Sequence, residues 1–244
     1  MSLPSSQAYQ LDSKTGEIMT IPSDTRALDQ YLTKDLDALL TGPHWSEMQL
    51  TDEGVSYRAA ESSHSKVRIM HACIRLPLTS MQTVRTFLGD SNNARVYSSE
   101  CSKLAVLHTW ADEPRRSIIS TEISFSVPLV RSRFLSWYST ETINAQGCYI
   151  RAARSCRWPG AEVPRGAVRA LLYCSGFIVV PTNSNNNNAA AAAAAAGNGG
   201  GGCTLHYISQ ADPCGMIPSA IVNQLQQDQL HVPLRIKKHL EGKQ

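Results

Sequence analysis

The chain has 244 residues, with 23 Lys or Arg against 20 Asp or Glu, so its net charge is only +3. This length suits one large domain or two small ones, and the near-neutral balance excludes a general nucleic-acid binder with a strongly basic surface. No run of 18 apolar residues is present, and the polar N-terminus lacks an apolar signal-peptide core. The odd number of cysteines, seven, favours a reduced, cytoplasmic protein over a disulfide scaffold.

The first 22 residues are polar and without periodicity, and we expect them to form a flexible N-terminal arm. Residues 23–244 are predicted to form one domain that starts with a helix, which Ser23 or Asp24 can cap. Gly42 and Pro43 end this helix. Its apolar stripe has helical spacing and comprises Leu28, Tyr31, Leu32, Leu36, Leu39 and Leu40.

The rest of the chain reads mainly as strands. Strand patterns cover residues 45–50, 55–59, 66–75, 94–98, 103–109, 117–127, 148–153, 168–181 and 203–209. A short amphipathic helix is predicted at 78–88, and a long helix from about Ile217 to Leu240. Short turns between strands favour an antiparallel sheet, so the predicted class is α+β.

Residues 183–202 read NSNNNNAAAAAAAAGNGGGG, a low-complexity segment between two strand patterns. Such a composition buries too little apolar surface to offset the entropy of ordering, so we expect a disordered loop inserted into a hairpin. The segment is either a tolerated repeat expansion or a partner-binding arm.

Convincing motifs for catalysis and for cofactors are missing from the sequence. Gly197, Gly199 and Gly202 formally match G-x-G-x-x-G, but they lie inside low complexity and are followed by a strand pattern instead of a helix. The cysteines include no C-x-x-C pair, the histidines no H-E-x-x-H, and no G-x-S-x-G elbow or P-loop lysine motif occurs. We therefore predict no metal site, no cofactor and no catalytic residue.

The segment from Asp212 to Asn223 reads DPCGMIPSAIVN and is the most informative part of the chain. It resembles the end of START domains, the lipid-transfer domains related to steroidogenic acute regulatory protein. In that family a final strand leads into D-P-x-G-x-I-P-x-x-I-V-N and then into the C-terminal helix. The matching residues are Asp212, Pro213, Gly215, Ile217, Pro218 and Asn223.

Further similarities lie upstream in the same order and extend the resemblance over about residues 24–240. They are Trp45 with GVSYR at 54–58, PLVRSRFL at 128–135, Val168-Arg169 with the strand pattern at 177–181, and VPL at 232–234. Two departures stand out. Arg133 replaces an acidic residue of the family pattern, and the arginine that pairs with a buried glutamate in sterol-binding members falls near Tyr138, which weakens a sterol assignment.

The resemblance implies a helix-grip fold, in which a curved antiparallel sheet wraps around the long C-terminal helix and leaves an internal apolar tunnel. It implies non-enzymatic binding and transfer of a single lipid, a phospholipid, sterol or related molecule, between membranes. The C-terminal helix would gate the tunnel, and Pro233 should weaken that helix. One alternative is a lipid-sensing or protein-interaction module without transfer activity. Another is an enzyme on the same scaffold, for which His71, His206 and Glu122 are the only suggestive residues.

The expected lipid contacts come from the sheet and from the last helix. Glu122 and Tyr138 are the candidates for the lipid head group, although the face of the strand that carries Glu122 is polar and can equally be solvated. Met216, Ile217, Ile221 and Leu225 are the candidates for the tunnel wall, with a role in the core as the alternative.

Membrane contacts are expected at Trp110 and at the basic C-terminal end, which carries Arg235, Lys237 and Lys238. The alternatives are a packed Trp and basic residues that offset the helix macrodipole. Arg133 is expected to be a surface charge, with a head-group ligand as the alternative. The expected partners are a lipid and, transiently, a membrane surface, with no nucleic acid, and the protein is expected to be a monomer.

Overall fold

The computed structural model describes residues 19–22, 24–42, 44–62, 67–98, 100–111, 115–125, 130–182, 201–217 and 219–242. Most of the predicted arm (1–22) and of the predicted insert (183–202) lies outside these residues, as do Ser23 and Pro43. The end of the arm is described, and it is not loose, because β1 (Met19–Thr20) pairs in parallel with β8 (Tyr149–Arg157).

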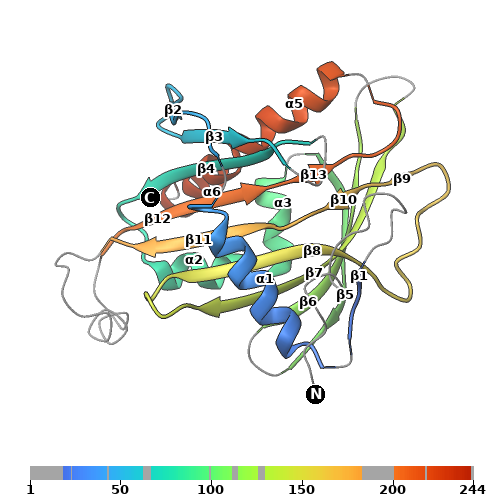
Figure 1. The fold of residues 1–244 in the computed structure, drawn as a ribbon, viewed down its shortest axis with the longest axis horizontal. Coiled ribbons are helices and arrows are strands. Elements are labelled where there is room, and N and C mark those ends of the chain that lie inside the picture. The colour runs from blue at the N-terminus through green and yellow to red at the C-terminus, as the bar shows by residue number, and fades with distance from the viewer. Residues whose placement is uncertain are drawn as a thin grey trace.

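One large antiparallel sheet forms the body of the protein, in the order β2-β3-β4-β12-β11-β8-β7-β6-β5 (Figure 1). The described strands β2 and β5 lie at opposite ends of this order and do not pair with each other, so the sheet is open. Its other strands are β2 (Gln49–Leu50), β3 (Ser56–Ala60), β4 (Ile69–Leu76), β5 (Cys101–Thr109), β6 (Arg116–Ile123), β7 (Arg133–Ile143), β11 (Ser175–Pro181) and β12 (Cys203–Ser209).

Three further short strands, β9, β10 and β13, complete the β structure. β9 (Val168–Arg169) runs parallel to the start of β7, with Val168 opposite Arg133. β10 (Leu171–Leu172) and β13 (Ala211–Asp212) form a separate two-stranded antiparallel sheet. This small sheet leads the chain from β12 toward the last helices.

Helix α1 (Arg26–Ala38) covers one face of the sheet, which we call the outer face, and crosses β7, β8 and β11 (Figure 1). Leu28, Leu32 and Leu36 recur at helical spacing and are fully buried against the strands. The N-cap position is Thr25, whose side chain makes no capping hydrogen bond, so neither Ser23 nor Asp24 is the cap expected from the sequence. Asp24 accepts a hydrogen bond from the Arg26 backbone N–H at 3.0 Å just before the helix.

The other helices lie on the opposite, inner face (Figure 1). They are α2 (Met81–Gly89), α3 (Ala94–Tyr97), α5 (Ser219–Leu230) and α6 (Val232–Glu241). Because side chains alternate along a strand, each central strand contributes to two separate cores. The inner core comprises Val55, Ala72, Ile74, Leu76, Val84, Phe87, Leu88, Tyr149, Phe177, Val179, Cys203, Leu205, Leu230, Val232, Leu234 and Ile236.

The strand predicted at residues 94–98 is wrong, because this segment is helical. The Asp90 side chain accepts a hydrogen bond from the Asn92 N–H at 2.9 Å and starts the 3₁₀ turn η2 (Ser91–Asn93). Asn93 donates to the Phe87 carbonyl at 2.8 Å, so the chain stays coiled and continues into α3. Local side-chain capping thus overrides the strand-like alternation of Ala-Arg-Val-Tyr.

The central strand β7 is missing from the sequence-based prediction. Its two faces both mix apolar and polar residues, because Tyr138 and Thr140 face α1 whereas Trp137 and Ser139 face inward. A strand that carries polar groups on both faces lacks the simple alternation on which the prediction depended. The aromatic and β-branched residues of the segment were the remaining signal.

The predicted long C-terminal helix consists of two helices, α5 and α6, separated at His231. Pro233 is the second residue of α6, where its missing N–H has no helical partner to lose. The weak point expected at Pro233 is therefore a complete break. Among the described residues, no helix is both long enough and apolar enough to cross a membrane.

Shortening one leucine side chain in the apolar stripe of α1 should destabilise the whole protein. Leu32→Ala leaves a cavity between α1 and the sheet, and we expect it to lower the free energy of unfolding by about 2–5 kcal/mol. The measurement is urea denaturation followed by circular dichroism. Lys34→Ala, an exposed position on the same helix, is the control and should change stability by less than about 0.5 kcal/mol. Equal effects of the two variants would show that α1 is not part of the core.

Candidate functional site

A cavity of about 190 Å³ lies between the inner face of the sheet and the helices α3, α5 and α6. It is partly open to solvent. Small side chains on the central strands leave this space, and larger apolar ones form its walls. The strand residues that line it include Ile119, Thr121, Leu135, Trp137, Ser139, Ala153, Gly176, Phe177 and Tyr207.

A second compartment of about 70 Å³ continues the cavity toward the start of α5. It is lined by Phe125, Pro213, Val222 and Leu225, among others. The two compartments are adjacent, since both are bordered by Ile123, Leu135, Ala211 and Gln229. Together they form an elongated, mostly apolar space under α5, which is the usual character of a small-molecule site.

Helix α5 roofs both compartments and is held at two hinges. At its start, Cys214 and Gly215 both have positive φ angles, 50° and 68°, and the Asp212 carboxylate accepts a hydrogen bond from the Cys214 N–H at 2.8 Å. At its end, the break at His231 separates it from α6. The contrast between the helices is clear: α6 buries Val232, Pro233, Leu234 and Ile236, whereas α5 carries Gln226, Asp228 and Gln229 on the cavity side.

Arg151 is the cation in the wall of the main compartment. Its Nε donates to Ser139 Oγ at 3.1 Å, one terminal nitrogen donates to the Leu88 carbonyl, and the other donates to Ser91 Oγ at 3.3 Å. All three acceptors are neutral. Strand β8 was expected from the sequence, but Arg151 was not singled out, because alternation does not say which face of a strand lines a cavity.

Arg133 is not the surface charge that the sequence suggests, because only 3% of it is exposed and it lines the second compartment. It donates to the Pro213 carbonyl at 2.6 Å and to the Cys214 carbonyl at 3.2 Å, and also to the carbonyls of Arg131 and Ser132. Burial lowers the pKa of the guanidinium. Arg133 therefore fastens the first hinge of α5 to β7.

The two predicted head-group residues lie on the outer face of the sheet and do not line the cavity. Glu122 alternates with the cavity-lining Thr121 and Ile123, and its carboxylate pairs with Lys103 at 2.8 Å and accepts from Ser132 at 3.1 Å. These hydrogen bonds hold its pKa below the usual value. Tyr138 is fully buried under α1 and donates to the Asp29 carboxylate. In both cases the side chain lies on the face of its strand opposite to the one that lines the cavity.

The four candidates on the last helix separate into different environments. Leu225 lines the second compartment. Ile221 is buried, with 9% exposed, and Ile217 is half-buried, but neither is among the residues that border the cavity. Met216 is fully exposed beside the first hinge of α5.

The residues expected to touch a membrane are engaged within the protein. Trp110 packs edge-on against His108 and Tyr138, with ring centroids 4.5 and 5.6 Å apart. The basic C-terminal side chains have these partners: Arg235 pairs with Asp228 and donates to the Tyr97 carbonyl at 3.0 Å, Lys237 donates to the Arg75 carbonyl at 3.0 Å, and Lys238 pairs with Glu53 at 3.1 Å. The ring contacts agree with the packed-Trp alternative for Trp110, whereas membrane contact by the basic end stays a prediction.

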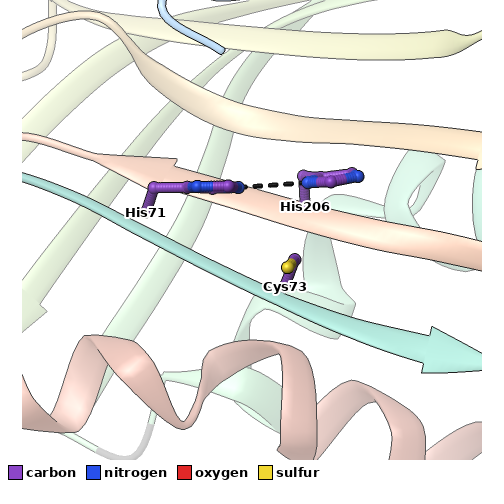
Figure 2. Close-up of side chains that lie close together, drawn as sticks. All are labelled: His71, Cys73 and His206. Carbon is purple, nitrogen blue, oxygen red and sulfur yellow. Dashed lines mark hydrogen bonds between the residues drawn. The ribbon is translucent and has the colours of Figure 1, made fainter. Parts of the chain in front are cut away.

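The side chains of His71, Cys73 and His206 form a cluster (Figure 2). It lies on the outer face, because these residues alternate with Ala72, Ile74 and Leu205 of the inner core. His206 on β12 is opposite Cys73 on β4, and the His71 Nε2 and His206 Nδ1 atoms are 3.0 Å apart. Arg58 Nε donates to His71 Nδ1 at 2.9 Å. His71 therefore carries its hydrogen on Nε2 and donates a hydrogen bond from it to His206 Nδ1, so that a chain of hydrogen bonds joins β3, β4 and β12.

This cluster is the one group of three metal-ligating side chains that the described residues bring within 4.8 Å, but it does not suit a metal ion. A ligating imidazole normally donates its second N–H to an acceptor, whereas His71 accepts from a guanidinium at that nitrogen. Burial together with Arg58 lowers the pKa of His71 to about 3 and that of His206 to about 4. The two neutral rings therefore serve the sheet, and none of the three residues suggested for catalysis lines the cavity.

Comparison with known proteins agrees with this architecture. The family model of the START domain matches residues 27–240, so the chain belongs to the START domain family. A comparison with curated protein sequences found no match.

Several solved structures share the fold. Human StAR-related lipid transfer protein 5 is 11% identical with a TM-score of 0.67, over 88% of this chain and 97% of that one. Human STARD10 is 14% identical with a TM-score of 0.63, over 93% and 86% of the two chains. The lipid transfer and protein localization domain of human StarD13 is 15% identical with a TM-score of 0.61, over 86% and 95%. The helix-grip class expected from the sequence is thereby confirmed.

The histidine pair should make the protein less stable in mild acid. Because both folded-state pKa values lie below 6.5, the unfolded chain binds more protons, so the stability present above about pH 6.5 is lost as the pH falls toward 4. Between pH 7 and pH 5 we expect a loss on the order of 2 kcal/mol for each histidine. Urea denaturation at the two pH values measures it.

The double variant His71→Leu with His206→Leu should show a smaller difference between the two pH values than the unchanged protein. His44→Gln, at an exposed position, is the control and should keep the full difference. An unchanged pH dependence in the double variant would show that these rings titrate normally.

Proposed function

We propose that this START domain binds a single lipid in the cavity under α5 and transfers it between membranes without catalysing a reaction. The observation that carries the proposal is the elongated apolar cavity in two adjacent compartments between the sheet and a helix hinged at both ends. The sequence-based expectation of a cytoplasmic monomer that contacts membranes transiently belongs to the same proposal.

The energetics explain why a carrier needs such a cavity. Each methylene removed from water is worth about 0.8 kcal/mol, and a lipid in a bilayer already has that burial. A carrier must match the burial almost completely for the lipid to leave the membrane, and must not exceed it by much for the lipid to be delivered. An apolar space under a movable roof meets both conditions.

Helix α5 is the proposed gate, and α6 is its anchor. The polar side chains of α5 on the cavity side reduce the free energy gained when the helix closes, whereas the apolar residues of α6 remain in the core. The ion pair between Asp228 on α5 and Arg235 on α6 spans the break between the helices, and Arg235 also holds the end of α3. We infer that this pair keeps the gate closed.

The cavity can be filled from within to test lipid binding. Ala153 lines the main compartment from the middle of β8, and Ala153→Phe places a ring where the lipid would lie. We expect lipid uptake from liposomes by the delipidated protein to fall by about tenfold or more, equivalent to roughly 1.4 kcal/mol or more. Ala105→Phe, at an exposed position on β5, is the matched control. Normal uptake by a folded Ala153→Phe variant would refute the cavity as the binding site.

Release of the gate should accelerate transfer. Asp228→Asn removes a partly buried ion pair worth about 1 kcal/mol, so the open form should gain about fivefold in population. Transfer of a fluorescent lipid between donor and acceptor vesicles should speed up correspondingly and lose part of its dependence on salt. Glu61→Gln breaks an exposed pair with Arg68 and should change nothing. A protein that takes up lipid but transfers none, whatever the variant, would favour a lipid-sensing module.

A further inference from the structure

We propose that the polar end of the bound lipid is an anion, a carboxylate or a phosphate, and that Arg151 binds it. The site lies at the end of the main compartment next to α2 and η2. This inference rests on the proposed function, because it names the class of lipid that the same cavity holds.

The hydrogen-bonding state of Arg151 leaves it able to bind a ligand. A guanidinium group has five N–H donors, and Ser139, Leu88 and Ser91 accept three hydrogen bonds from it. These acceptors fix the plane of the group without reducing its positive charge. Arg133, at the other end of the cavity, differs because four backbone carbonyls accept from it.

No described carboxylate forms an ion pair with Arg151. Glu141 lies opposite Arg151 in the β7–β8 register, but its Oε1 accepts from Arg85 at 3.0 Å and its Oε2 from Tyr149 at 2.8 Å. Asp228 lines the same compartment and is paired with Arg235. A charge next to an apolar cavity without an ionic partner is unfavourable, and an anionic head group would relieve this.

The shape of the cavity favours a ligand with one apolar chain. Arg151 lies opposite Glu141 and Thr121 opposite Leu135, and these two positions of β7 are separated by about 20 Å along the strand. The compartments are small compared with the roughly 300–1,000 Å³ of pockets for drug-sized molecules. An elongated single-chain amphiphile suits these dimensions better than a two-chain lipid.

Thr121 supplies a second polar point far from Arg151. Its side-chain hydroxyl is buried, borders the main compartment, and has no hydrogen-bond partner among the described protein groups. An unpartnered buried hydroxyl is unfavourable, and a ligand that reaches it can form the missing hydrogen bond. The cavity thus has a cationic end, an apolar middle and a hydroxyl near the other end.

The test compares three ligands with the same oleoyl chain and different polar ends. Oleate carries a carboxylate, oleoyl lysophosphatidate a phosphate, and monoolein no charge. Binding to the delipidated full-length protein is measured by displacement of a fluorescent fatty-acid probe. We expect at least one anionic ligand to bind about tenfold or more tightly than monoolein, since charge-assisted hydrogen bonds to arginine are stronger than neutral ones. The preferred anion identifies the head group.

The variants separate charge from packing. Arg151→Gln should lose this preference and bind monoolein unchanged, and Arg151→Lys should keep part of it, because lysine retains the charge without the fork of donors. Arg157→Gln, at an exposed position on the same strand, is the control and should retain the full preference. Should Arg151→Gln not fold, the comparison of ligands on the unchanged protein and on Arg151→Lys still decides.

Equal binding of monoolein and both anions by the unchanged protein, without an effect of Arg151→Gln, would overturn the assignment of an anionic head group and leave lipid carriage intact. Failure of every lipid to enter the delipidated protein, with the fold preserved, would instead overturn the proposed function.

Discussion

The fold depends on one constraint: both faces of the central strands must be covered, and different helices cover each face. On the outer face, α1 supplies the leucines that bury the alternate residues of β7, β8 and β11. This one-sided coverage stabilises the sheet enough that its inner face can carry small and polar residues, such as Ser139, Ala153 and Gly176, over the middle of the same strands. The cavity lies where these small side chains leave the space under the helices unfilled.

Much of the architecture was predictable from local patterns, whereas the residues that line the cavity were not. The stripe of α1, the hairpin strands β11 and β12, and the weak point at Pro233 all follow from periodicity and from the chemistry of proline. The C-terminal motif led to the correct family. The strand prediction for residues 94–98 failed because Asp90 and Asn93 impose a helical turn through side-chain hydrogen bonds. A pattern of apolar residues gives no information about such hydrogen bonds.

The errors at the site have a common cause. Glu122 and Tyr138 were placed on strands that do form, but the choice of face depends on which helix covers which side of the sheet. A sequence gives the period of a strand and leaves its phase relative to the core undetermined when both faces are mixed. The same ambiguity hid Arg151 and Thr121, and it made Arg133 resemble a surface residue although the first hinge of α5 closes over it.

The two ends of strand β12 connect to very different parts of the chain. At one end, Cys203 pairs with Pro181, where the chain leaves and re-enters the sheet around the low-complexity segment. At the other end, Ser209 leads through β13 to Cys214 and the roof of the cavity. Seven residues of strand, about 23 Å, separate the two, and β4 and β11 hold the strand on both sides. A change in the length of the segment at the first end therefore acts a full strand away from the roof of the cavity at the second, and a longer surface loop adds little closure entropy.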